Sequence, residues 1–235
     1  MVQSNVSAST IQIPGPACSI RAFQVAPVGA GPYPAVIVIQ EWWGLNEHIK
    51  DVATRFAREG YVAVAPDLYS RLGNTVTADP NEAGKLMTSL HKPDGVADLL
   101  AVVSYLKTAA GVRGERLGVT GFCMGGSYTV LLACESRDIK AAAAFYGEVP
   151  ADDVVARLDC PLLYVYGDQD GWIQKADVER LRATAQRQGK FADVQIYPGT
   201  PHAFFNDTRK DVYRAKEAQD AWARTLRLFK QHLAS

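Results

Sequence analysis

Cys123 is the side chain in this sequence best placed to do chemistry. It stands in the segment RLGVTGFCMGG (Arg116–Gly126), between an apolar run that predicts a strand and a run, GSYTVLLACE, that predicts a helix. A small–x–nucleophile–x–small turn between strand and helix is a nucleophile elbow, a strained turn that presents a Ser or Cys for attack. The alternative is a buried structural thiol in a glycine-rich turn, and the rest of the chain must decide between the two.

A thiol is mostly protonated at neutral pH, so a catalytic cysteine needs a base, and that base needs a carboxylate to orient it. His202 lies in a loop after a short apolar run and is our candidate base. Asp168 and Asp170 share an earlier loop of the same kind. We favour Asp170 as the acid because it lies further into the loop and can reach His202, whereas Asp168 is placed to cap the turn. The other histidines are expected in the first helix, an upstream loop and the last turn of the closing helix: His48, His91 and His232.

An oxyanion formed at Cys123 would need two backbone N–H donors. The elbow supplies one from the residue after the nucleophile, Met124, and the loop after an early strand supplies the other, which we assign to Trp42. The order of nucleophile, acid and histidine along the chain is the order found in α/β-hydrolases.

Apolar runs and helical periodicity alternate along the chain and predict its elements. Strands are expected at 10–13, 18–25, 35–40, 61–65, 117–120, 141–146, 161–166 and 194–197, and helices at 46–59, 81–89, 94–109, 126–135, 174–188 and 209–233. The first two strands read as antiparallel, and the later alternation predicts a mostly parallel sheet with helices on both faces. Because ligands bind at the carboxyl ends of such strands, the shared strand-end position of Glu41, Cys123, Asp170 and His202 supports a common site.

Composition excludes several other classes of protein. The 25 basic and 25 acidic residues balance, which gives no reason to expect a nucleic acid or an anionic membrane as partner. The four cysteines lie far apart without a CxxC pair, and no phosphate-binding or dinucleotide motif is present, so we expect no metal and no cofactor. Without a signal-peptide pattern or a membrane-length apolar run, a cytoplasmic protein is expected.

Several motifs together resemble the dienelactone hydrolase (carboxymethylenebutenolidase) family of α/β-hydrolases over nearly the whole chain. They are VIVIQEWWGLN (36–46), APDLYSR (65–71), GFCMGG (121–126), FYG (145–147), YGDQD (166–170) and GTPHAF (199–204). The resemblance implies one α/β-hydrolase domain over residues 1–235, without a large separate cap, and a triad of Cys123, Asp170 and His202. It also implies that Glu41 holds the resting thiol in an unreactive orientation until substrate displaces it. A structural carboxylate that accepts loop amides is the other interpretation of Glu41.

The sequence departs from the family pattern where substrate would be held. Members that cleave dienelactone use two arginines to bind its carboxylate, and Pro80 and Asn206 stand at the matching positions here. Arg71 and Arg209 are the possible substitutes. The pocket would otherwise be lined by apolar side chains suited to a less charged ester, with Trp43, Tyr146, Trp172 and Phe204 as its predicted lining.

The sequence therefore predicts a cysteine-dependent hydrolase of lactones or small carboxylic esters, acting as a monomer on a small-molecule substrate. One alternative is a hydrolase with the same fold and catalytic residues that acts mainly on aryl esters, thioesters or organophosphates. Another class of function is a catalytically silent protein that binds a ligand or senses redox state through Cys123.

Overall fold

The computed structural model describes residues 5–234, which contain eight strands of a mostly parallel α/β sheet, as the sequence predicts. The chain divides into two compact units that meet in the sequence between Gly118 and Val119, and each is described separately. Among the described residues, the helices are too short or too polar to cross a membrane.

The first unit begins with an antiparallel hairpin. β1 (Val6–Pro14) pairs with β2 (Ser19–Pro27), and β2 pairs antiparallel with β4 (Val62–Pro66). β3 (Tyr33–Ile39) then lies parallel to β4, which gives the order β1-β2-β4-β3. The predicted antiparallel entry is thus confirmed. Central β3 residues and all of β4 are buried, as their β-branched and small apolar residues require.

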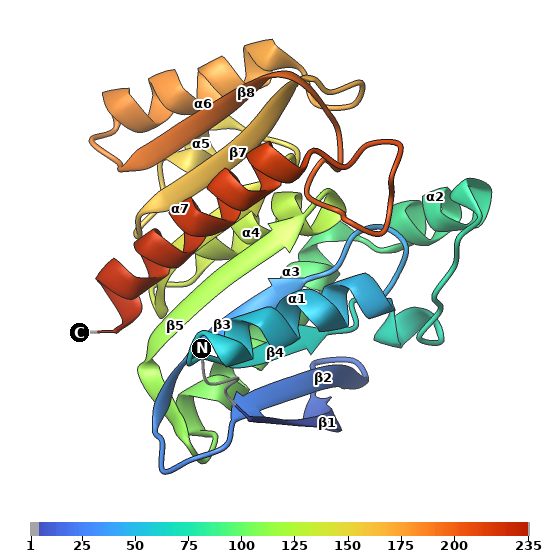
Figure 1. Cartoon of the computed structure of the whole chain (residues 1–235), viewed down its shortest axis with the longest axis vertical. Coiled ribbons are helices and arrows are strands. Elements are labelled where there is room, and N and C mark those ends of the chain that lie inside the picture. Colours follow the sequence, from blue (N-terminus) through green and yellow to red (C-terminus); the bar gives the residue numbers. More distant parts are fainter. Residues whose placement is uncertain (1–4, 235) are drawn as a thin grey trace. The chain divides into compact units, whose positions relative to one another are not determined.

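Helices lie on both sides of these strands (Figure 1), with α1 (Glu47–Arg58) in front and α3 (Lys92–Thr108) behind. α1 begins where the side chain of Asn46 accepts a hydrogen bond from the Ile49 amide, a common way to satisfy a helix N-terminus. The irregular segment between β4 and α3 holds a single 3-10 turn, η1 (Ser70–Leu72), and the predicted short helix, α2 (Pro80–Ser89).

The second unit begins within β5 (Val112–Phe122), whose end lies beside β6. The parallel strands run in the order β6-β7-β8. α4 packs on β6 and α6 on β8, with α5 in contact with both helices, while α7 packs on β6 and β7. Figure 1 shows α7 in front of the strands and α4 behind them. The bounds are α4 (Met124–Glu135), β6 (Ile139–Phe145), α5 (Asp152–Val155), β7 (Leu162–Gln169), α6 (Lys175–Arg187), β8 (Ala192–Pro201) and α7 (Ala215–Leu233).

One predicted helix boundary is wrong, and one short helix was not predicted. The closing helix begins at Ala215 and not at Arg209, because the side chain of buried Asn206 accepts hydrogen bonds from the amide and hydroxyl of Thr208 and folds the intervening residues into turns. The short α5 has no helical repeat long enough to reveal it in the sequence.

Candidate active site

Cys123 has the backbone of a nucleophile elbow. It joins β5 directly to α4, and its φ of 56° and ψ of −120° are strained for a residue with a side chain. The strain is held in place from both sides, because the Cys123 amide donates to the Phe145 carbonyl and the Cys123 carbonyl accepts from the amides of Gly126 and Ser127. The side chain therefore stands at the N-terminus of α4, where the helix dipole favours negative charge on a thiolate or an oxyanion.

The glycines around the elbow are required by close backbone approaches. A Cβ at Gly121 would collide with the Gly125 backbone, and a Cβ at Gly126 would collide with the Phe145 carbonyl oxygen. Gly147 is equally constrained, since its Cβ would meet the backbone of Gly126 and Ser127. The turn at Cys123 can therefore pack against β6 only with glycine at these positions.

Asp170 and His202 form a hydrogen-bonded pair at the ends of adjacent parallel strands. Oδ2 of Asp170 lies 2.6 Å from Nδ1 of His202, and its Oδ1 accepts from the amides of Trp172 and Ile173 at 2.8 and 2.9 Å. The Asp170 side chain is fully buried, whereas that of His202 is 23% exposed. Because the carboxylate accepts at Nδ1, this nitrogen carries the proton and Nε2 is left as the proton acceptor.

Asp168 has a different role in the structure. Its Oδ1 accepts from the amide of Gly199 at 2.7 Å, which joins the carboxyl end of β7 to that of β8, just before Asp170 and His202. Gly199 has a φ of 67°, a left-handed conformation that suits glycine. The carboxylate expected to cap the turn thus links the ends of two paired strands.

Aromatic rings surround the imidazole of His202. The ring centroids of Tyr146 and Trp172 lie 4.9 and 5.5 Å from it, both edge to face. Phe204, which we predicted to line a pocket, is fully buried between Tyr146 and Tyr197. These rings restrict the imidazole to the plane in which it meets Asp170.

In the first unit, Glu41 and its neighbours form a braced loop after β3. Glu41 is 1% exposed, and the two tryptophans that follow it are half-buried with ring centroids 4.8 Å apart. The Trp42 carbonyl accepts from the hydroxyl of buried Tyr69, and the Trp43 carbonyl accepts from the Thr77 amide. These bonds fix the backbone at the residue to which we assign an oxyanion N–H.

His48 lies in the first turn of α1, directly after this loop, and is buried. It was assigned no role in the sequence analysis. Its Nδ1 lies 3.7 Å from Oε2 of Glu41, with side-chain exposures of 2% and 1%. A signal for it existed, because His48 stands one helical turn before Val52, on the same buried stripe as Ile49. A histidine on the apolar face of an amphipathic helix predicts a buried side chain with a polar neighbour.

The residues considered for binding a substrate carboxylate are engaged elsewhere. Arg71 makes two hydrogen bonds of 2.8 Å to the buried carboxylate of Asp98 on α3, which raise the pKa of its guanidinium. Arg209 pairs with Asp211 at 2.9 Å. Pro80 is the exposed first residue of α2, and Asn206 is the buried side chain that folds the turns before α7.

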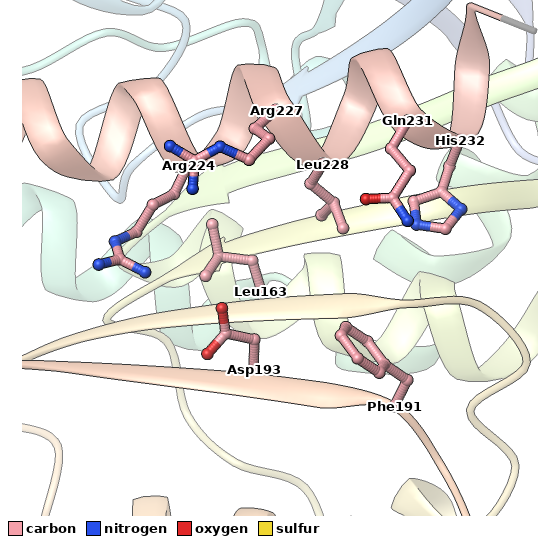
Figure 2. A pocket seen from close by; sticks show the side chains of 8 residues that line it. All are labelled: Leu163, Phe191, Asp193, Arg224, Arg227, Leu228, Gln231 and His232. Atoms are coloured by element: carbon pink, nitrogen blue, oxygen red, sulfur yellow. The ribbon is translucent and has the colours of Figure 1, made fainter.

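A hollow of about 260 Å³ in the second unit is not lined by Cys123, Asp170 or His202. Figure 2 shows the eight side chains that line it, from α7, β7, β8 and the residue just before β8: Leu163, Phe191, Asp193, Arg224, Arg227, Leu228, Gln231 and His232. Leu163 is near the amino end of β7, whereas Asp170 follows the carboxyl end of the same strand, roughly 20 Å further along. This hollow is not the place where Asp170 and His202 would act.

Two other cysteines of the second unit are buried thiols. Burial raises the pKa of Cys134 and that of Cys160 to about 12 each, so both stay protonated at neutral pH. Cys18, in the first unit, is partly exposed. Within the described part of the chain, no group of three or more His, Cys, Asp or Glu side chains is arranged to hold a metal ion.

Comparison with known proteins places this α/β fold in a family. The model of the dienelactone hydrolase family matches residues 20–233, so the chain belongs to that family. A protein of Methylorubrum extorquens named "putative carboxymethylenebutenolidase" is 37% identical over 237 residues, covering 96% of this chain and 81% of its own. An Escherichia coli K12 protein of the same name is 37% identical over 245 residues, covering 97% and 88%.

Solved structures agree with this placement. The crystal structure of a "putative dienelactone hydrolase" from Klebsiella pneumoniae superposes with a TM-score of 0.91 at 34% identity, covering 97% of this chain and all of the other. A dienelactone hydrolase-like promiscuous phosphotriesterase from metagenomic libraries has a TM-score of 0.89 at 21% identity and shares the fold.

Proposed function

We propose that the protein is a cysteine-dependent hydrolase of lactones or small carboxylic esters. The observation that carries the proposal is the Asp170–His202 pair, in the same unit as a thiol held at a left-handed elbow. A structural cysteine has no need of a strained backbone at a helix N-terminus, and an oriented imidazole with a free Nε2 is what a thiol requires as base.

In the proposed reaction, Nε2 of His202 accepts the proton of the Cys123 thiol and Sγ attacks the ester carbonyl carbon. The resulting oxyanion accepts hydrogen bonds from the amides of Met124 and Trp42. When the tetrahedral species collapses, the carbon–oxygen bond to the alcohol breaks and His202 protonates the departing oxygen. Water, deprotonated by His202, then attacks the acyl-thioester, which releases the acid and restores the thiol. Glu41 acts before the first step by holding the resting thiol, which substrate releases.

We further propose that the substrate is an ester without an obligatory carboxylate. A substrate carboxylate at Arg71 would have to compete with the bidentate pair that this arginine makes with Asp98, and such paired, planar contacts are the strong ones. The half-buried side chains of Trp43 and Trp172 supply aromatic surface for an uncharged acyl or alcohol group. Tyr146 and Phe204, predicted with them as pocket lining, are fully buried and pack against each other instead.

The test is hydrolysis of a short nitrophenyl ester by the native protein, Cys123→Ala and Cys18→Ser. Cys123→Ala should lose about 10³-fold or more in kcat/KM, whereas Cys18→Ser should retain native turnover because its thiol lies outside the machinery. Undiminished turnover in Cys123→Ala would overturn the mechanism. Turnover absent from the native protein with every ester, thioester and organophosphate of a panel would instead favour a silent, ligand-binding protein.

A further inference from the structure

We propose that His48 is the positioning residue of Glu41, and that it sets how Glu41 holds the resting thiol. This inference rests on the proposed function, in which Glu41 acts on Cys123. The two side chains are 3.7 Å apart at Nδ1 and Oε2 and are almost completely buried.

Because both side chains are buried, the surroundings of Glu41 strongly affect the orientation of its carboxylate. A buried carboxyl group costs free energy unless polar neighbours compensate it, and the imidazole of His48 is a polar group that lies 3.7 Å from Oε2 of Glu41. The separation is longer than a direct hydrogen bond, so the imidazole steers the carboxylate electrostatically and limits its rotation. A carboxylate that must hold a thiol, and later release it, needs a defined orientation.

The backbone between the two residues keeps their separation fixed. The Gly44 amide donates to the Glu41 carbonyl, and the Asn46 amide donates to the Gly44 carbonyl. The Asn46 side chain then begins α1 by accepting from Ile49, which sets the direction of the first helical turn and with it the ring of His48. Gly44 has a φ of 91°, and a Cβ there would collide with the Thr75 carbonyl, so the loop admits one compact path.

The experiment measures the alkylation rate of Cys123 by iodoacetamide in a Cys18→Ser background. His48→Asn keeps a nitrogen near the position of Nδ1, whereas His48→Gln moves its amide towards the position of Nε2, so the two polar variants differ in the atom that faces Glu41. We expect His48→Asn to alkylate within about twofold of the background, and His48→Gln to change the rate about three- to thirtyfold in the direction of Glu41→Gln. Glu41→Gln/His48→Gln should change it no further than Glu41→Gln alone.

His91→Gln is the matched control, since His91 makes a similar pair with Asp94, at 3.9 Å, but is 73% exposed. Its alkylation rate should equal that of the background. Native rates in both His48 variants, beside an altered rate in Glu41→Gln, would overturn the role of His48 and leave the action of Glu41 standing. A native rate in Glu41→Gln would overturn both, while the loss of turnover in Cys123→Ala would still support the hydrolase.

Discussion

Nδ1 of His202 and Oδ2 of Asp170 are 2.6 Å apart, and the second oxygen of that carboxylate accepts two backbone amides. The Asp170 carboxylate is therefore fixed by backbone amides of its own loop as well as by the imidazole. The proposed roles of Asp170 as acid and His202 as base can be tested by changing one carboxylate atom.

Asp170→Asn should reduce kcat/KM by about 10²–10⁴-fold. The amides of Trp172 and Ile173 require an oxygen acceptor, so the new amide nitrogen faces His202, favours the wrong tautomer and removes Nε2 as a base. Nitrophenyl ester kinetics measure this loss. Asp168→Asn is the matched control and should stay within about threefold of native, because its remaining oxygen can still accept from the Gly199 amide. The reverse order of effects would contradict the assignment of the acid.

Gly126→Ala should destabilise the fold by about 1–3 kcal/mol or more, since its Cβ would collide with the Phe145 carbonyl oxygen. Chemical denaturation followed by circular dichroism measures the free energy of unfolding. Gly171→Ala should change it by no more than about 0.5 kcal/mol, because a Cβ there meets nothing within 4 Å. Equal stability of the two variants would show that the elbow does not need its close backbone contacts.

The free energy of unfolding should fall as the pH rises above about 9, the unfolded pKa of a thiol. Cys134 and Cys160 have folded pKa values raised to about 12, so the folded state keeps their protons while the unfolded state loses them. Their stabilising contribution is complete below pH 9 and is lost between pH 9 and 12, at up to about 1.4 kcal/mol per pH unit for each thiol. Cys160→Ala should flatten the slope of stability between pH 9 and 10.5, as measured by denaturation at each pH. An unchanged slope would assign the alkaline loss to other groups.

Pro80→Arg should raise kcat/KM for an ester that carries a carboxylate by about tenfold relative to its uncharged analogue. Pro80 is exposed at the start of α2, and a Cβ built at Gly84 of the same helix would lie 3.9 Å from the Trp42 ring. Parallel kinetics with the matched pair of esters give the ratio. Asn206→Arg should instead lower the melting temperature, because it buries a cation and removes the acceptor that folds the turns before α7. A preference unmoved by Pro80→Arg would mean that α2 does not face the acyl group.

The helices and strands that were predictable from the sequence are those whose own residues show a periodic apolar pattern or a clear start or end signal. The apolar runs of β3 and β4 and the stripe of Ile49, Val52 and Phe56 on α1 are local patterns. The start of α7 was not predictable, because it depends on a side-chain bond between Asn206 and Thr208 that competes with helix formation.

The same distinction applies to the candidate site. Position along the chain was enough to choose Asp170 over Asp168 as the partner of His202. No local pattern reveals that Asp168, at the end of β7, accepts from Gly199 of β8. The pairing of Arg71 with Asp98 depends on tertiary packing between segments that are separate in the sequence. The approach of His48 to Glu41 depends on the compact path of the short loop between them.

The left-handed backbone at Cys123 has a consequence for how this scaffold can change. The turn is held by main-chain hydrogen bonds and by close contacts at glycines, none of which requires a particular side chain at position 123. A hydroxyl at position 123 would be carried to the same place by the same turn. If Cys123 is the nucleophile, as proposed, substitution by serine exchanges the attacking atom without any change to the backbone that presents it.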